Sequence, residues 1–218
     1  MSSSNTYTYA PEIGEFTDEA YERAQIDPAG LTARHARSAR RSLNLMFSAW
    51  ANEGVHLFAV DEQTQTLTDG GPSYSAATGT LAILEAVIRR SGIDTPVTRI
   101  SREDYHMIPD KTVEGMPSQV YFDRAAGTYY LWNVPENSTD VLRYYRLRRL
   151  QDVTAASETP DVPYRWYEAL AAGLAARLAG KFAKPLENDL VLKAADALAK
   201  AKREDRERVD TAVSVEIW

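Results

Sequence analysis

The stretch that decides the fold runs from residue 100 to residue 179 and contains three informative pieces. They are ISREDYHMIPDKTVEGMPSQVYFDR (100–124), TYYLWNVPENSTDVLRYYRLRRLQDV (128–153) and DVPYRWYEALAAGLAARLA (161–179). The first two are punctuated by Pro and Gly and are dense in Tyr and Trp, which is typical of strands joined by turns. The third is rich in alanine and leucine, which favours a helix. The sequence therefore predicts a β segment that leads directly into a helix.

Composition sets broad limits on what this chain of 218 residues can be. It is 44% hydrophobic and 10% aromatic, enough for one or two domains with a sizeable core. It has no cysteine, which excludes disulfide and thiolate chemistry. No apolar run approaches the roughly 20 residues of a membrane span, and residues 1–11 lack the basic and apolar regions of a signal peptide. We therefore expect a soluble protein without a membrane partner that stays where it is made.

The charge balance bears on nucleic-acid binding. The net charge is −6 and the isoelectric point is about 5.2, whereas a protein that reads DNA sequence usually presents a net basic face to the phosphates. Two basic runs stand out, at residues 34–41 and 143–149. They can be solvated faces, members of ion pairs, or a contact with another protein.

Two helices are expected before residue 54. Thr17 is the predicted N-cap of the first, with Asp18 and Glu19 in its first turn, and residues 27–30 break it. The second is expected over residues 32–52, where apolar residues recur at the helical period of 3.6. Its predicted core face contains Leu43, Met46, Phe47 and Trp50.

Two more helices are expected after residue 160. Asp161 is the predicted N-cap of the alanine-rich helix and Pro163 lies in its first turn. Its predicted buried stripe contains Trp166, Leu170, Leu174 and Leu178. A last helix is expected over about residues 187–206. Because neither helix pair can bury its apolar stripe alone, the two pairs should form one bundle.

The middle of the chain is expected to form strands. Candidates are residues 55–60, 65–67, 97–100, 118–123, 128–133 and 141–150, with a hairpin loop at 123–127. Residues 81–90 fit either a helix or a strand. The predicted fold class is α+β and mainly α: a helical bundle made by the N- and C-terminal helix pairs, with an inserted small antiparallel β region and an extended C-terminal arm. The expected boundaries are a flexible N-terminus at 1–14, the bundle at 15–54 and 161–208, the β-rich insert at 55–160, and the arm at 209–218.

No pattern indicates catalysis. The three histidines, His35, His56 and His106, do not pair at metal-ligand spacing, and no nucleophile elbow, dinucleotide fingerprint or phosphate loop is present. Neighbouring carboxylates fall at expected helix starts, turns and a charged helix end. We therefore predict no catalytic residue, no metal site and no cofactor. The aromatic residues between 121 and 145 can be the core of a β domain, anchors of a subunit contact, or platforms for base stacking beside the arginines at 143–149.

Several short pieces, taken in order, carry a family resemblance. They are SREDY (101–105), KTVEGMP (111–117), YFD (121–123), LWNVP (131–135) and the VP (162–163) that opens the alanine-rich helix, with RSLNLM (41–46), Trp50 and Gly54 upstream. Over about residues 15–205 the chain resembles the head-to-tail connector family of tailed phages, also described as adaptors, packaged-DNA stabilisation proteins or tail accessory factors. In that family the region matching 81–90 is a strand.

The resemblance implies a structural protein of the virion rather than an enzyme. It implies a ring, commonly of twelve copies, beneath the portal at the head–tail junction, which lengthens the DNA channel, helps retain packaged DNA and attaches the tail. The implied partners are the portal protein, neighbouring copies of the chain, tail or nozzle proteins, and double-stranded DNA in transient non-specific contact. Assembly would take place in the host cytoplasm. An acidic balance is compatible with this role, because a channel wall must let DNA slide. The alternatives are a DNA-binding accessory protein and a soluble enzyme or ligand-binding domain.

The end of the chain has its own pattern. Val213, Val215 and Ile217 alternate with polar residues, and Trp218 closes the sequence. Such a segment suits addition to the sheet edge of another protein or insertion into its groove. We therefore predict that these four residues bind a partner; the alternative is that the segment folds back onto the chain's own β region.

Overall fold

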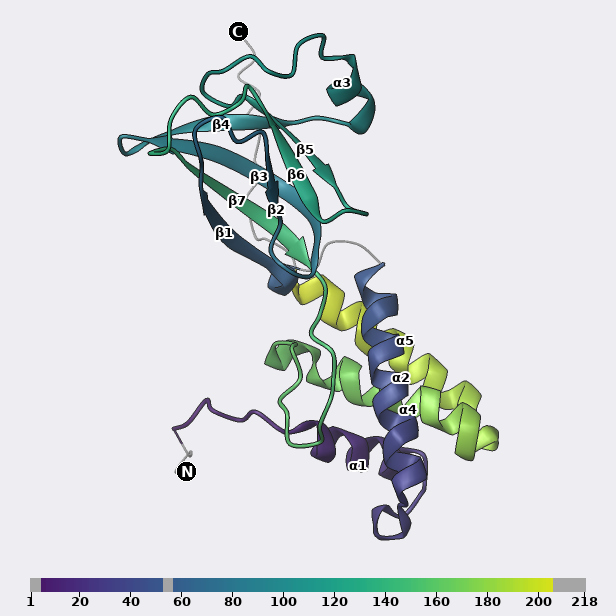
Figure 1. Ribbon diagram of the computed structural model, residues 1–218. Helices are drawn as coiled ribbons and strands as arrows, with labels where there is room; N and C mark the ends of the chain where they lie inside the picture. Colours follow the sequence, from purple (N-terminus) through teal and green to yellow (C-terminus); the bar gives the residue numbers. More distant parts are fainter. Residues whose placement is uncertain (1–4, 53–56, 206–218) are drawn as a thin grey trace, which may run out of the picture. The chain divides into compact units, whose positions relative to one another are not determined.

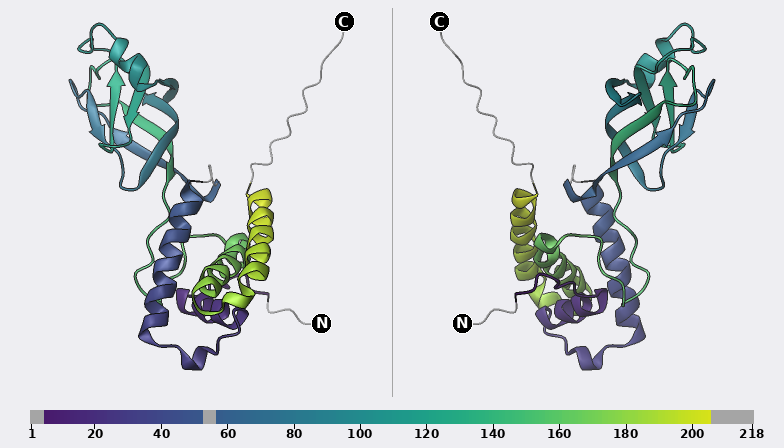
Figure 2. Two further views of the ribbon diagram at one scale, coloured as in Figure 1. Left: turned by 90° about the vertical axis from the view of Figure 1, so that its right-hand side faces the viewer. Right: turned by 90° about the vertical axis from the view of Figure 1, so that its left-hand side faces the viewer.

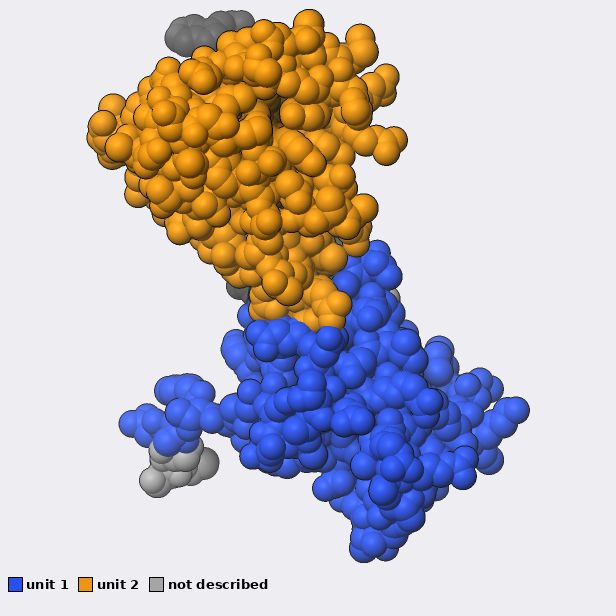
Figure 3. Space-filling model, viewed as in Figure 1, with its two compact units in different colours: residues 1–58, 151–218 blue, residues 59–150 orange. Residues whose placement is uncertain are grey.

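The computed structural model describes residues 5–52 and 57–205, and the chain divides into two compact units (Figure 3). Unit 1 comprises residues 1–58 and 151–218, so the two ends of the sequence belong to one unit. Unit 2 comprises residues 59–150. The first unit is built from helices and the second from a sheet (Figure 1).

Unit 1 is organised around one central helix. Its long helices are α1 (Ile13–Arg23), α2 (Ala33–Ala51), α4 (Tyr167–Phe182) and α5 (Glu187–Glu204), with 3-10 turns at Pro28–Gly30, Tyr164–Trp166 and Lys184–Leu186. α4 contacts α1, α2 and α5 (Figure 2). Its alanines and leucines are buried on almost every side, which fits a helix enclosed by three others, because small side chains let helix axes approach closely.

The observed N-termini of the helices differ in how well the capping residues in the sequence predicted them. α2 begins at Ala33, within one residue of the predicted start, and Thr32 is its N-cap. α1 begins five residues before the predicted position, with Glu12 as N-cap and Glu15 completing a capping box. Thr17, the predicted cap, instead donates a hydrogen bond from its hydroxyl to the carbonyl of Ile13 at 2.8 Å.

The alanine-rich helix also starts elsewhere than predicted. Asp161 does not cap α4, which begins at Tyr167 after a 3-10 turn. The Asp161 carboxylate accepts a hydrogen bond from the backbone N–H of Gln151 at 2.9 Å. The side chain of a potential cap residue can accept hydrogen bonds from several nearby N–H groups. Here the chain from residue 151 to residue 163 folds so that the N–H of Gln151, and not one of α4, reaches the Asp161 carboxylate.

Unit 2 is a seven-stranded mixed sheet. Its strands are β1 (Val60–Thr66), β2 (Ser73–Ser75), β3 (Thr80–Arg90), β4 (Ile93–Arg99), β5 (Gln119–Asp123), β6 (Thr128–Trp132) and β7 (Val141–Arg148). Their order is β1-β7-β3-β4-β5-β6-β2. All neighbouring pairs are antiparallel except β4 and β5, which are parallel and are connected through the short helix α3 (Arg102–Met107).

The sheet curls around its own core (Figure 1). Tyr129 of β6 and Tyr144 of β7 are both buried, and their ring centroids lie 5.6 Å apart although three strands separate β6 from β7 in the sheet order. That contact requires curvature, because neighbouring strands in a sheet are already about 4.8 Å apart. The concave side holds the main apolar cluster, which includes Leu67, Ile83, Ile88, Val120, Leu131 and Leu142.

The predicted fold class is therefore wrong. The β part is not a small antiparallel insert in a mainly helical bundle; it is a seven-stranded, curled and mixed sheet that forms a compact unit of its own. The parallel pair is short, joining Thr98 and Arg99 to Gln119 and Val120. Pro96 lies before that pair and faces only Val87 of β3, so its missing N–H removes no bond to β5. A pairing between strands that are distant in the sequence produces no periodic pattern of residues, so the sequence pattern did not predict it.

Two strand predictions have clear outcomes. Residues 81–90 form a strand, β3, as the family resemblance implied. Residues 61–64, predicted as a polar break between two strands, lie inside β1. β1 tolerates them because it is the last strand of the sheet and because the Asp61 carboxylate receives the guanidinium of Arg146, with 2.7 Å between Oδ1 and Nε.

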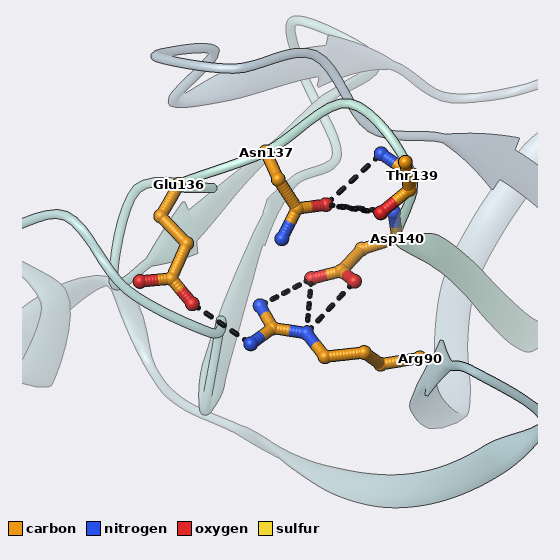
Figure 4. A network of polar contacts seen from close by, with 5 residues as sticks. All are labelled: Arg90, Glu136, Asn137, Thr139 and Asp140. Atoms are coloured by element: carbon orange, nitrogen blue, oxygen red, sulfur yellow. Dashed lines mark hydrogen bonds and ion pairs between the residues drawn. The ribbon is translucent and has the colours of Figure 1, made fainter.

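Another ion pair joins the last residue of β3 to the residue that precedes β7 (Figure 4). The side chain of Asp140 is fully buried and accepts hydrogen bonds from Arg90, with 2.6 Å between Oδ2 and the Nη2 atom. Arg90 also reaches Glu136, and the side-chain oxygen of Asn137 accepts from the N–H groups of Thr139 and Asp140. The network fixes the loop before β7 and satisfies a carboxylate that would otherwise be costly to bury.

Candidate interaction surfaces of unit 1

The eight residues of the predicted bundle core lie in unit 1 and are all buried there. Five of them have no measurable exposed surface: Leu43, Trp166, Leu170, Leu174 and Leu178. The structure brings the two predicted faces together, because the indole rings of Trp50 and Trp166 lie 5.2 Å apart between centroids. This core positions the outer faces of the surrounding helices.

The other predicted residues have different surroundings. Val213, Val215, Ile217 and Trp218 lie outside the described residues, as does His56. His35 occupies the third position of α2, where its Nδ1 accepts a hydrogen bond from the backbone N–H of Thr32 at 3.1 Å. His106 is exposed in the last turn of α3.

The outer face of α2 carries a row of arginines. Arg34, Arg37 and Arg41 follow a spacing of three and four residues, which places them on one face of the helix, and all three are exposed. α2 contains no acidic residue. Within the described residues, none of the three forms an ion pair with a carboxylate, whereas Arg23, Arg90, Arg146 and Arg165 do. We call these three residues the arginine row.

A lysine from α4 extends this positive surface. The Lys181 Nζ donates to the hydroxyls of Ser42 at 2.6 Å and Ser38 at 3.2 Å. Both serines are buried on the side of α2 next to the arginine row. Desolvation and the nearby charges of Arg41 and Arg177 hold the pKa of Lys181 below its usual value. The surface therefore concentrates positive charge on a chain that is acidic overall.

The second basic run in the sequence is different. Arg143 pairs with Glu62, and Arg146 is nearly buried and pairs with Asp61. These two arginines link β7 to β1 within unit 2. Two arginine-rich runs thus have different surroundings. The arginines of β7 pair with carboxylates of β1, whereas the arginine row of α2 has no carboxylate partner among the described residues.

An apolar groove of about 370 Å³ lies between α2, α4 and α5. Its lining includes Met46, Trp50, Ala176, Val191 and Leu198. The approach of α4 to α2 depends on Gly173, since a Cβ atom there would lie 2.7 Å from the sulfur of Met46. Val191 is half exposed beside the groove. The groove is suited to receive an apolar side chain of a partner, and sequence periodicity alone does not reveal it because three separate helices form it.

The aromatic residues of unit 2 divide between the two faces of the sheet. Tyr129 and Tyr144 are buried in the concave core. On the other face Tyr121, Tyr130 and Tyr105 of α3 pack together, with centroid distances between 5.4 and 5.8 Å. The second cluster is partly exposed and ties α3 to the sheet.

Residues 5–52 and 57–205 contain no group of three or more His, Cys, Asp or Glu side chains placed to hold a metal ion. Over the same residues, no helix combines the length and the apolar character needed to cross a membrane.

Comparison with known proteins identifies the family. The model of the SU10 adaptor protein family matches residues 13–216, nearly the whole chain. No curated protein matches the sequence significantly. The chain therefore belongs to the SU10 adaptor protein family, and the resemblance to phage head-to-tail adaptors is confirmed. It is a structural adaptor of the phage particle.

Proposed function

We propose that this adaptor forms a ring of twelve copies beneath the portal vertex, joins head to tail, extends the DNA channel and helps to retain packaged DNA. The observation that carries the proposal is the family match, which spans residues 13–216 and so includes both units. The role is structural rather than enzymatic. Its partners are the portal protein, neighbouring copies, tail or nozzle proteins, and DNA in transient contact.

The free chain is monomeric or weakly associated in this proposal, and the ring forms on the portal. The support is the abundance of surface charge and the lack of a long heptad seam in the sequence. Light scattering of the purified chain at micromolar concentration should give the mass of one copy. Added portal protein from the same phage should carry a ring whose copies are counted by electron microscopy. A stable ring without portal, or no ring with portal, would contradict the proposal.

The C-terminal residues serve as the arm that reaches the portal. The last described residue before them is well anchored: the Asp205 carboxylate accepts a hydrogen bond from the backbone N–H of Leu57 at 2.9 Å and pairs with Arg165. Residues 211–218 are too few to form a sheet of their own, so their alternating apolar side chains need another surface. A partner's sheet edge or groove provides one.

Deletion of residues 211–218 tests the arm. The truncated chain should keep its melting temperature and lose binding to the portal. Serine at Val213, Val215 and Ile217 should have the same effect, while alanine at Ser214 and Glu216 is the matched control and should leave binding intact. A truncated chain that melts several degrees lower and still docks would show that the segment packs on its own chain instead.

A second candidate function is that of a DNA-binding accessory protein. The observation in its favour is the arginine row, which lacks ion pairs among the described residues. A net charge of −6 opposes it. Affinity for duplex DNA measured at several salt concentrations tests this function. A DNA-binding protein should lose affinity steeply as the salt concentration rises, because its contacts with phosphates are electrostatic, and a chain without measurable affinity at low salt would exclude it.

A further inference from the structure

Two helices of unit 1 carry rows of opposite charge with the same spacing. The arginine row of α2 is Arg34, Arg37 and Arg41, at intervals of three and four residues. On α1, three carboxylates repeat those intervals at Glu15, Asp18 and Glu22. Each row lies on one face of its helix and spans about 10 Å, because a helix rises about 1.5 Å per residue.

Both rows are directed to solvent. α1 buries Ile13, Phe16, Ala20 and Tyr21 against the rest of unit 1, while the side chains of Glu15, Asp18 and Glu22 are exposed. The three arginines of α2 are likewise exposed on the side opposite its buried face. We call the α1 residues the carboxylate row.

The rows do not neutralise each other within one copy. In the described part of the chain, no ion pair joins α1 to α2, although Asp18 and Arg37 line the same hollow of unit 1. The only α1 ion pairs in that part involve Arg23, which binds Glu19 and Glu168. The Glu15 carboxylate accepts a hydrogen bond from the backbone N–H of Glu12 at 3.4 Å. Six exposed charges of matched spacing are thus left for an outside partner.

From this complementarity we infer that the arginine row of one copy docks on the carboxylate row of the next copy in the assembly. The inference rests on the proposed ring and names the contact that joins its members. A contact between two different patches is of the head-to-tail kind that closes into rings. Charge complementarity mainly sets register and partner choice at such an interface, which suits a subunit that assembles only at its proper place.

Charge reversal with mixing tests the contact. The first variant carries Arg34→Glu, Arg37→Glu and Arg41→Glu, and the second carries Glu15→Arg, Asp18→Arg and Glu22→Arg. In each variant alone, every contact brings like charges together. In a mixture, alternating copies bring opposite charges together again at every contact, and a ring with an even number of members can alternate throughout.

The measurement is the yield of infectious particles from a phage that lacks this gene and is complemented from plasmids. Each variant alone should lower the yield at least about a hundredfold, because several like-charge contacts form at each interface. Expression of both variants together should restore most of the wild-type yield. Purified particles from the mixture should contain the two variants in equal amounts. The matched control is Arg102→Glu with Arg124→Glu, which reverses two exposed arginines of unit 2 and should leave the yield unchanged.

Each result has a definite meaning. Failure of the mixture, with both variants folded and melting within a few degrees of wild type, overturns the inference. So does full yield from either variant alone. Loss with the arginine variant but not with the carboxylate variant would mean that the arginine row binds DNA phosphates instead. If a triple variant fails to fold, the double variants Arg34→Glu with Arg41→Glu and Glu15→Arg with Glu22→Arg provide the same test, because they reverse both ends of each row and so do not depend on the relative direction of the two helices. The proposed function fails separately, if the phage lacking the gene needs no complementation.

Discussion

The indole rings of Trp50 and Trp166 lie 5.2 Å apart between centroids at an interplanar angle of 60°, in the buried contact between α2 and the 3-10 turn that precedes α4. The two residues are 116 positions apart in the sequence, so this contact joins the N-terminal and C-terminal parts of unit 1. Its contribution to stability should exceed what each ring buries separately, because tilted aromatic pairs attract one another beyond area burial.

A double-mutant cycle measures that coupling. Trp50→Leu, Trp166→Leu and the double variant should give a coupling free energy of about 0.5–1.5 kcal/mol by urea unfolding. The control cycle pairs Trp50→Leu in unit 1 with Leu142→Ala in the core of unit 2, and its coupling should be near zero. Strictly additive losses for the two tryptophans would show that the ring contact adds nothing.

Leu170→Ala should destabilise unit 1 by roughly 2–5 kcal/mol, because the side chain is fully buried in α4 and its removal leaves a cavity. Chemical denaturation gives the free energy of unfolding. Leu192→Ala in α5 is the matched control: that leucine is 71% exposed, so its loss should cost less than about 0.5 kcal/mol. A cost below about 1 kcal/mol at Leu170 would mean that α4 packs through another face.

Asp140→Ala should lower the stability of unit 2 by about 1–3 kcal/mol, since it leaves the Arg90 guanidinium without its buried partner and frees the loop before β7. Glu136→Ala removes the exposed partner of the same arginine and should cost less than about 1 kcal/mol. Thermal unfolding of the two variants side by side gives the comparison. Equal losses of stability in the two variants would show that the burial of Asp140 does not increase the contribution of its ion pair.

The ion pair of Asp61 and Arg146 should make unit 2 sensitive to acid. The Arg146 side chain holds the pKa of Asp61 below its usual value. A carboxyl whose pKa is lower in the folded state stabilises that state above its unfolded pKa, about 3.9, and loses this contribution as the pH falls through the folded value. Asp61→Asn should therefore flatten the dependence of stability on pH below about 4. Parallel curves for wild type and variant over that range would contradict this assignment.

Local signals predicted the elements whose causes are local. α2 follows from apolar residues at the helical period, and the hairpin of β5 and β6 follows from the loop between Asp123 and Gly127. In that loop the Asp123 carboxylate accepts hydrogen bonds from the N–H groups of Ala125 and Ala126, and Gly127 takes a positive φ of 65°. The order of such pieces along the chain was also enough to identify the adaptor family.

Other features depended on residues far apart in the sequence. The start of α1 at Ile13 is tied to the loop before α4, because the backbone N–H of Ile13 donates to the carbonyl of Glu158 at 2.8 Å. The same applies to the β region: β1 continues through polar residues because Arg146 of β7 lies beside Asp61. Capping preferences and residue periodicity do not predict these two features, because the residue that hydrogen-bonds to Ile13 or to Asp61 comes from a distant part of the sequence.

The sequence by itself determined the helical core residues of unit 1 as candidates, the alternation of strands and turns in the middle of the chain, and its membership of a phage adaptor family. Only the tertiary structure decided that the strands form one curled mixed sheet, and that the arginines at 143 and 146 form ion pairs whereas the arginine row of α2 forms none with the residues described. The physical reason is the separation in sequence between the residues that interact. Helical and strand periods arise from neighbours a few residues apart, whereas sheet order, curvature and charge compensation arise from contacts that form only after distant segments have packed.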